Sequence, residues 1–438
     1  MFEQAVYAGR NHTVSLAVAL IATALLAPAA RADDVAQVRL GSSLQDLIAG
    51  PDGGAWVRIQ RGTRASLGRA FPDGRFITAP VDDSVADAGG ALGPDGQAWF
   101  TSGLRQLVRM DPAGQVSIIG IPERGDSIDD DIATGPDGTL WATTVLDKTI
   151  AHVTPQGVVA YTRTTLPECG DEDPSITAIT RAADGAMWLA DPPCERLLRV
   201  TPGGAWTTIA LRDEPTELLA PDLTGGVWFA AHEEVGHVDS AGKVSRFALP
   251  DGDDATDVAV APDGSAAFAL GRCVLARAAT PGGPLTFTRI PVPARHVAFD
   301  PVGGLWLTSG ARLVHIAPTE PAGACDETPP TVRVTPRERV SVGALRRSGL
   351  RIAVREPAAI SALAFYRGPG EQFDVGDVLD TNVEGARGGT VRYRVPRTIL
   401  RRFARAAAAG RDVEVGLLLS VTDREGNTNE VQLDLSVS

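Results

Sequence analysis

The chain has 438 residues, of which 44% are hydrophobic and only 5% aromatic, and its 47 glycines and 31 prolines allow many turns. Its formal net charge is −13; since the residues from 328 onward carry 17 arginines and 13 acids, the first 327 residues carry −17. Phosphate contacts need clustered Lys or Arg, so this balance argues against nucleic acid as a partner and favours cations or basic ligands.

The N-terminus has the pattern of a secretory signal peptide covering residues 1–32. Arg10 and His12 precede an apolar run from Val14 to Ala27, and Ala30-Arg-Ala32 offers a small-x-small cleavage site before Asp33. The run is shorter than the ~20 residues that a transmembrane helix needs. We therefore expect a secreted or cell-envelope protein with no transmembrane segment after cleavage; a retained N-terminal anchor is the alternative.

One phrase then occurs seven times: a short apolar run, a Pro-Asp-Gly or similar turn, and an aromatic residue. Successive aromatic residues lie 43, 42, 47, 40, 40 and 38 positions apart. A period near forty with a hairpin turn in each unit is typical of a β-propeller, with one four-stranded blade per unit. The seven occurrences are Gly50–Trp56, Gly93–Trp99, Gly135–Trp141, Ala183–Trp188, Leu223–Trp228, Ala261–Phe268 and Asp300–Trp306.

These units predict an all-β fold in which residues 33–318 form a seven-bladed propeller. In the third unit we expect strands at residues 131–134, 140–144, 149–154 and 158–162, with glycine providing positive φ in the turns. The seventh unit has only three strands before Pro318. Val35–Leu40 has the right length to supply its outer strand, which would close the ring and remove a free sheet edge.

Four cysteines in an exported chain predict disulfides. Cys169 lies in the loop entering the fourth unit and Cys194 in the loop after its second strand, and such loops emerge on the same face of a blade. Cys273 and Cys325 then pair by elimination. Four reduced, partly buried thiols are the alternative.

The composition and the periodicity of the sequence change after Pro318. Residues 319–330 are a linker rich in Pro, Gly and acids, and residues 331–438 lack the forty-residue period. Six short strands and one amphipathic helix, Thr398–Ala409, predict an immunoglobulin-like β-sandwich. Its arginines are interpreted as a solvated surface, with contact to an acidic cell-wall polymer as the alternative. The strands are expected at residues 331–334, 350–354, 360–366, 390–395, 413–421 and 430–437.

The loops that enter the first strand of each unit are strongly acidic and predict a ring of carboxylates on one face. Hard oxygen ligands of this kind suit Ca²⁺ or Mg²⁺, and they also suit a cationic substrate. A solvated acidic face is the alternative, since no loop matches an EF-hand register. The candidate metal ligands are Asp129, Asp131, Asp171, Asp173, Asp253 and Asp257.

The phrase Gly-Pro-Asp-Gly-x-x-Trp-(Phe/Ala)-Thr, followed by a strand and turn such as Leu107–Gly114, resembles the streptogramin B (virginiamycin B) lyase family of seven-bladed propellers over residues 35–318. More loosely it resembles NHL-repeat and gluconolactonase-like propellers. The lyase resemblance implies an elimination that opens a cyclic depsipeptide at its ester. It also implies a histidine base at the start of a first strand and Mg²⁺ held by nearby glutamates.

This implied site carries over only in part. His296 falls near the position of the base, but the acids that hold the metal correspond to Ala294 and to Ser309 or Gly310. A second histidine of the family corresponds to Asp257 or Val258. Of the residues three positions after each aromatic residue, only Asp191 is acidic.

Three hypotheses about function follow. The first is an exported, non-catalytic propeller that binds a small molecule, peptide or glycan on its acidic loop face. The second is a metal-dependent lyase or lactonase acting on a cyclic ester or depsipeptide, for which His296, His232, Glu233 and Asp191 are the candidate catalytic residues. The third is a structural envelope protein whose acidic rim binds calcium. No serine-nucleophile elbow, P-loop or HExxH motif occurs in the chain.

Overall fold

The structure, a computed structural model, describes most of the chain from residue 33 onward. The predicted signal peptide and residues 319–324 of the predicted linker lie outside the described residues. The described ranges are 33–38, 42–61, 64–81, 89–102, 106–121, 128–144, 149–163, 169, 174–212, 215–250, 252–318, 325–336, 339–367, 374–383, 388–410, 413–423 and 427–438.

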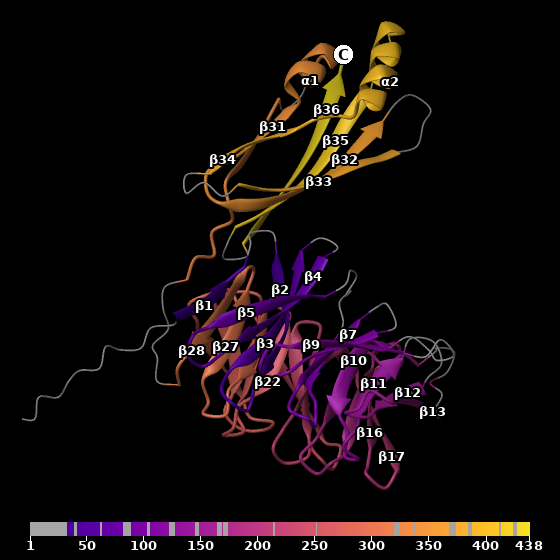
Figure 1. Cartoon of the computed structure of the whole chain (residues 1–438), viewed down its shortest axis with the longest axis vertical. Helices are drawn as coiled ribbons and strands as arrows, with labels where there is room; N and C mark the ends of the chain where they lie inside the picture. Colours follow the sequence, from indigo (N-terminus) through magenta and orange to yellow (C-terminus); the bar gives the residue numbers. More distant parts are fainter. Residues whose placement is uncertain are drawn as a thin grey trace, which may run out of the picture. The chain divides into compact units, whose positions relative to one another are not determined.

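Residues 33–316 form seven four-stranded antiparallel sheets, one for each repeat unit (Figure 1). We number the units one to seven in the order of their turns. Their strands are β2–β5 (Ser43–Ala49, Ala55–Arg61, Arg64–Ala70, Phe76–Val81), β6–β9 (Gly90–Leu92, Ala98–Ser102, Gln106–Met110, Val116–Gly120), β10–β13 (Ile128–Thr134, Leu140–Thr144, Thr149–Val153, Val159–Arg163), β14–β17 (Ala178–Arg181, Met187–Asp191, Arg196–Val200, Trp206–Ala210), β18–β21 (Pro215–Pro221, Val227–Ala231, Glu234–Val238, Val244–Ala248), β22–β25 (Asp257–Val260, Ala266–Ala269, Val274–Ala278, Leu285–Arg289) and β26–β28 (His296–Phe299, Leu305–Ser309, Arg312–Ile316) with β1 (Asp33–Gln37).

The first strands of the seven units contact one another in cyclic order, from β2 through β6, β10, β14, β18 and β22 to β26, and β26 contacts β2. The N-terminal strand β1 pairs with β28, with Asp33 opposite His315 and Gln37 opposite Arg312. The sequence prediction that an N-terminal strand completes the last sheet is therefore confirmed, although the strand begins two residues earlier than expected. This pairing covers the edge of the last sheet at the point where the ring closes.

The turn phrase has the local role that its residues predict. In unit one the amide of Gly50 donates to the carbonyl of Gly54, and Gly53 takes a φ of 84° that side chains rarely adopt. The turn delivers Trp56 to a fully buried position, where it packs with Phe100 of unit two. Each tryptophan thus belongs to the packing between neighbouring sheets, in which a buried aromatic residue contributes a large apolar area.

Unit six departs from the predicted alignment by one residue. The equivalent of the tryptophans is Ala267, which pairs with Arg277 as Trp306 pairs with His315, and Phe268 is the residue after it. Phe268 remains fully buried and contacts Trp228 edge to face. The phrase Ser-Ala-Ala-Phe therefore keeps an aromatic ring in the core while leaving the usual position to alanine.

The C-terminal region contains two sheets and two helices. A three-stranded sheet has the order β29 (Val332–Thr335), β31 (Leu350–Val354), β34 (Gly389–Tyr393). A five-stranded sheet has the order β30 (Arg339–Val340), β36 (Thr428–Val437), β35 (Val413–Thr422), β32 (Ala358–Arg367), β33 (Asp374–Val383). The helices are α1 (Val342–Ser348) and α2 (Arg397–Ala408), which lie side by side in Figure 1. All share one hydrophobic core, in which Tyr366 packs edge to face on Phe403.

The predicted helix is present one residue earlier than expected, but the prediction of a single helix in this region was wrong. Helix α1 begins after Ser341, whose Oγ accepts a hydrogen bond from the amide of Ala344, and ends at Gly349 with a φ of 62°. This N-cap serine and C-terminal glycine are the signals that mark the helix in the sequence. Strand β33 was also missed.

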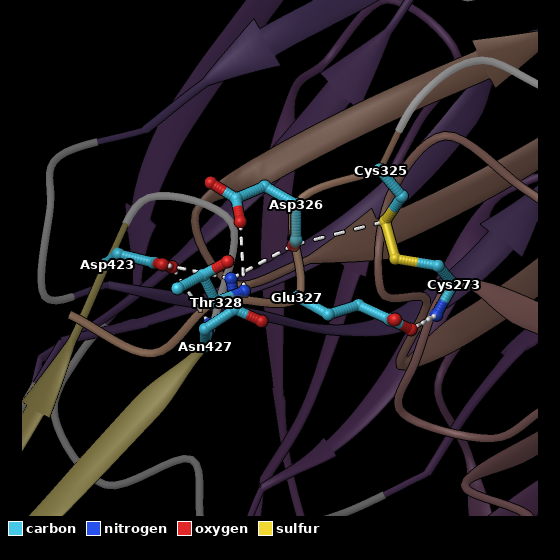
Figure 2. Close-up of a disulfide and its surroundings, with 7 residues drawn as sticks. All are labelled: Cys273, Cys325, Asp326, Glu327, Thr328, Asp423 and Asn427. Carbon is cyan, nitrogen blue, oxygen red and sulfur yellow. Dashed lines mark hydrogen bonds between the residues drawn. A yellow bond between two sulfur atoms is a disulfide. The ribbon is translucent and has the colours of Figure 1, made fainter.

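Two disulfides join the predicted pairs, Cys169–Cys194 and Cys273–Cys325. The second fixes the start of the described linker to unit six, and Glu327 adds a hydrogen bond of 3.0 Å to the amide of Cys273. Figure 2 shows Asn427, from the turn between β35 and β36, donating to the carbonyl of Asp326 over 3.0 Å. The linker is thus held by a covalent bond and by side chains on both sides.

Candidate functional site

A cavity of about 790 Å³ lies at the entry ends of the ring of first strands. Its wall includes an equivalent residue from six of the seven units, four positions before the residue whose amide closes the turn. We call the seven equivalent residues the entry ring. They are Asp46, Gly89, Asp131, Ala178, Leu218, Asp257 and His296, of which all but Ala178 line the cavity.

Two candidate metal ligands of the entry ring, Asp131 and Asp257, tie neighbouring units together. Asp257 accepts hydrogen bonds from the amide of Val258 in its own strand and from the amide of Val297 in the next unit, both over 2.8 Å. Asp131 accepts in the same way from Ile132 over 2.8 Å and from Ile179 over 3.0 Å. Both oxygens of each carboxylate are therefore already used to hold adjacent first strands in register.

The third carboxylate of the entry ring is neutralised by an arginine. Arg58 is only 1% exposed, and its guanidinium lies 2.6 Å from a carboxylate oxygen of Asp46. Asp46 takes a φ of 47°, an unusual backbone conformation outside glycine. In units two, three and seven the position of Arg58 is a buried threonine whose hydroxyl bonds to the backbone of the entry ring: Thr101, Thr143 and Thr308.

His296 is the entry-ring residue with the most chemical freedom. Its Nδ1 lies 3.7 Å from an oxygen of Asp257, and its Nε2 has no hydrogen-bond partner although that atom is buried. The side chain is 18% exposed and lines the cavity. Arg181 and Arg295, both exposed, also line the cavity, and neither guanidinium has a partner within the described part of the chain.

The remaining candidates lie away from the entry ring. Asp191 is fully buried, and its carboxylate accepts from Arg196 over 2.8 Å and from the amide of Ser175 over 3.0 Å. His232 is 80% exposed, and its Nδ1 lies 3.1 Å from Asp254. These contacts brace the loops of units four and five and do not bring the side chains into the cavity.

Two further candidates hold loops on the same face. The amide of Glu233 donates to Asp254 over 2.8 Å, at a turn where Glu233 takes a φ of 56°. Asp253 is 6% exposed and forms an ion pair with Arg272. Asp171, Asp173 and the side chain of Asp129 lie outside the described residues.

The donor set does not fit the magnesium that the lyase resemblance implies. The lyase resemblance aligns the metal-holding acids with Ala294 and with Ser309 or Gly310, none of which carries a carboxylate, and Ala294 and Ser309 are fully buried. Mg²⁺ needs hard oxygen ligands in near-octahedral geometry. Among the residues that the structure describes, no group of three or more His, Cys, Asp or Glu side chains is placed to hold a metal ion.

Three of the other histidines belong to a contact that sequence reasoning missed. In every unit an Arg or His on the third strand lies opposite the tryptophan position: Arg69, Arg109, His152, Arg199, His237, Arg277 and His315. Six of these side chains pair with a carboxylate of the turn, as His237 does with Asp222 over 2.7 Å. Their signal was a basic residue 9 to 13 positions after each tryptophan.

Two of these turn carboxylates, Asp222 and Asp52, have lowered pKa values. Burial alone would raise the pKa of Asp222, but hydrogen bonds from His237, Thr224 and Gly226 outweigh it and hold the pKa below 3.8. The pKa of Asp52 is lowered in the same way against its burial, by Arg69 and the amide of Gly54. Arg69 also stacks 3.8 Å above the ring of Trp56. The turn, the tryptophan and the cation therefore form one structural unit in six of the seven sheets.

A ring of first strands around a polar cavity defines a propeller-like repeat protein, in which the loops on one face carry the function. The sequence pattern of the Virginiamycin B lyase family matches residues 16–278. The chain belongs to this family.

Individual relatives are distant. A virginiamycin B lyase of Nocardia farcinica (strain IFM 10152) is 28% identical over 210 residues, which cover 46% of this chain and 69% of the relative. A solved streptogramin B lyase has a TM-score of 0.56 at 16% identity and covers 65% of this chain and 97% of its own. A catalytically inactive histidine-to-alanine variant of the Staphylococcus aureus virginiamycin B lyase, solved with quinupristin, has a TM-score of 0.54 at 15% identity, over 66% of this chain and 99% of its own.

One solved structure also extends over the C-terminal region. The extracellular domain of a putative hybrid two-component system from B. thetaiotaomicron has a TM-score of 0.53 at 13% identity, and covers 94% of this chain and 60% of its own. At this identity the likeness concerns the fold alone.

Proposed function

We propose that this protein is an exported, seven-bladed propeller that binds a ligand in the entry-ring cavity and does not carry out the metal-dependent elimination of its family. One observation carries the proposal: the carboxylates of Asp46, Asp131 and Asp257 are already bonded to an arginine or to backbone amides. Carboxylates engaged in this way hold the ring, and no group of three or more metal-ligating side chains gathers among the residues that the structure describes.

The cavity suits a ligand of moderate size. Its volume of about 790 Å³ falls within the range of small-molecule and peptide pockets, which is ~300–1,000 Å³. Arg295 and His296 offer donors to such a ligand, and Leu218 and Leu219 offer apolar contact. The chemistry available is thus recognition by hydrogen bonds and burial, as in a binding protein for a small molecule, a peptide or a glycan.

A lyase or lactonase is the second candidate, because His296 keeps an unpartnered Nε2 in the cavity wall and Asp257 beside its Nδ1. A histidine with an unpartnered ring nitrogen and a carboxylate nearby has the groups of a general base. The S. aureus relative is catalytically inactive in the variant that replaces one histidine with alanine. Against this candidate stands the donor set, which lacks the acids for the metal. No contact among the described residues favours the calcium-dependent structural role.

The domain organisation belongs to the same proposal. We place a signal peptide at residues 1–32, the propeller at 33–318, a linker at 319–330 and an immunoglobulin-like sandwich at 331–438. Two disulfides support an oxidising compartment outside the cytoplasm. No helix within the described ranges is long and apolar enough to cross a membrane.

A melting screen with peptides, glycans and cyclic depsipeptides tests the binding function. We expect a bound compound to raise the Tm of the parent but not of Leu218→Trp, which puts a bulky ring into the cavity wall. Leu223→Trp is the matched control, since Leu223 is 55% exposed in a turn. A compound that raises all three Tm values equally binds elsewhere and contradicts the proposal.

A turnover assay separates the two candidates. Quinupristin and simple lactones are incubated with chelator-treated and Mg²⁺-loaded protein, and ring-opened product is measured by mass spectrometry. We expect no product from either preparation. Product formed by the parent and lost in His296→Ala would establish an enzyme and refute the non-catalytic proposal.

A further inference from the structure

The C-terminal region concentrates its arginines in two stretches that contain no acidic residue. Residues 339–355 hold five arginines and residues 392–411 hold seven, which makes 12 of the 17 arginines after residue 328. None of the 13 acids of that region, and no lysine, falls in either stretch. A solvated face of an ordinary soluble protein mixes both signs of charge, so this segregation needs an explanation.

The fold brings the two stretches together. Strands β31 and β34 pair with Leu350 opposite Tyr393 and Arg351 opposite Arg392, at the end of the sheet where α1 precedes β31 and α2 follows β34. The two helices contact each other, and Figure 1 shows them side by side. Basic segments about forty positions apart in the sequence therefore meet at one end of the three-stranded sheet and expose arginines there.

We call this surface the arginine face and define it by six exposed side chains. No ion pair or hydrogen bond to a carboxylate engages any of them in the part of the chain that the structure describes. They are Arg346 on α1, Arg351 and Arg392 on the three-stranded sheet, and Arg397, Arg401 and Arg405 on α2.

These positions are unfavourable for the fold itself. Like charges directly opposite each other in a sheet, such as Arg351 and Arg392, repel. On α2, Arg397, Arg401 and Arg405 follow each other at i, i+4 spacing with no acid between them. Arg397 is also the first residue of the helix, where the helix dipole disfavours a cation. An anion supplied from outside would remove all three conflicts.

We propose that the arginine face binds a linear, phosphate-bearing polymer outside the cell. Residues at i, i+4 spacing stand about 6 Å apart along a helix, which makes a row of guanidinium groups against a chain of repeated charges. A guanidinium presents a planar fork that holds phosphate with two hydrogen bonds, whereas Lys offers a point charge, and the region uses arginine alone.

A membrane surface fits less well than a polymer. An interfacial helix inserts an apolar face, but Leu400, Phe403 and Ala406 of α2 are buried in the core of the region. Leu418, on β35, is the one exposed large hydrophobic side chain among the described residues after 302. The binding therefore rests on charge and hydrogen bonds without apolar insertion.

The test uses the full chain and long-chain inorganic polyphosphate as the probe, with binding followed by fluorescence anisotropy at several salt concentrations. The variant Arg397→Gln/Arg401→Gln/Arg405→Gln keeps good helix formers and removes three charges. Arg64→Gln/Arg212→Gln/Arg289→Gln removes three exposed arginines from the repeat units as the matched control. We expect the α2 variant to bind at least about tenfold more weakly at low salt and to lose roughly 2 from the slope of log Kd against log salt, while the control keeps the parent values.

Other outcomes would overturn the proposal. Equal weakening in both triple variants would show that only overall charge matters. Arginine-dependent binding to vesicles of phosphatidylglycerol and phosphatidylcholine as tight as to polyphosphate would assign the face to a membrane. Arginine-dependent self-association without any polymer, seen by sedimentation, would assign it to the acidic loops of another copy. Because the α2 variant changes no residue of the entry-ring cavity, its failure to weaken binding leaves the proposed ligand-binding function untouched.

Discussion

The contact between Asp222, Trp228 and His237 in unit five offers the sharpest test of how the repeats are held together. Asp222 is 1% exposed and accepts from His237 over 2.7 Å, from the amide and hydroxyl of Thr224 over 2.7 and 2.9 Å, and from the buried amide of Gly226 over 2.8 Å. Asp222→Ala removes all four acceptor contacts at once. The loss of stability in this variant therefore measures the combined contribution of all four hydrogen bonds to the carboxylate.

The size of the effect follows from burial. Removing one partner of a buried pair costs ~3–5 kcal/mol, and we expect a loss of about 4 kcal/mol in the free energy of unfolding. Asp263→Ala is the control: Asp263 is exposed and accepts only from the amide and hydroxyl of Ser265, so about 1 kcal/mol is expected. His237→Phe keeps a ring against Trp228 and completes a double-mutant cycle with Asp222→Ala, in which we expect a coupling of about 2 kcal/mol.

Urea unfolding followed by tryptophan fluorescence supplies these free energies. Equal losses in Asp222→Ala and Asp263→Ala would show that the cation on the third strand adds nothing to the turn. A coupling energy near zero in the double-mutant cycle would lead to the same conclusion. Either result would refute the reasoning that the turn, the aromatic ring and the basic residue act as one unit.

Three further predictions follow from the same contacts. The pKa values of Asp52 and Asp137 are lowered in the folded state, so the stability that these ionised carboxylates contribute is present above pH 3.8 and is lost as the pH falls through their folded pKa values. The Tm should therefore be constant near neutral pH and fall steeply in acid. A fall in Tm that begins near pH 6 would contradict this. Cys273→Ser/Cys325→Ser opens a loop of 52 residues and should lower the free energy of unfolding by about 4 kcal/mol relative to the oxidised parent, measured in urea; an unchanged free energy would contradict this. Asp257→Asn should reduce the free energy of unfolding of the metal-free protein by about 1–3 kcal/mol and so lower its Tm, because the side-chain amide of Asn has one oxygen and cannot accept from both Val258 and Val297. An unchanged Tm would mean that the carboxylate does not hold the two units together.

Much of the repeat architecture could be predicted because its determinants are local. The turn glycine, the buried aromatic residue and the forty-residue period each act within one unit, and the ring closure followed from one missing strand. The predicted alignment of the aromatic residues was wrong only in unit six. There the position of the tryptophans is occupied by Ala267, and Phe268 is the next residue. A single aromatic residue flanked by alanines does not fix a register in sequence.

The candidate site could not be predicted to the same depth because its contacts cross between units. That Asp257 would use its second oxygen on Val297, forty positions later, depends on the approach of two backbones, which no spacing reveals. The same holds for Asp131 and Ile179. Arg58 gave no signal either, since a buried arginine in a strand of apolar residues is recognisable only once Asp46 is seen beside it.

The two uses of carboxylate in this chain have opposite consequences for function. An acid that bonds two backbone amides is fixed in place and neutralised by dipoles, so it stabilises the ring but has little capacity left for a cation. Here the acids of the entry ring are tied, and the unpartnered groups at the described cavity wall include Arg181, Arg295, the Nε2 of His296 and the Oγ1 of Thr177. The accessible wall of the cavity therefore presents mainly hydrogen-bond donors. Its ligand is expected to bring hydrogen-bond acceptors or negative charge, in spite of the acidic composition of the repeats.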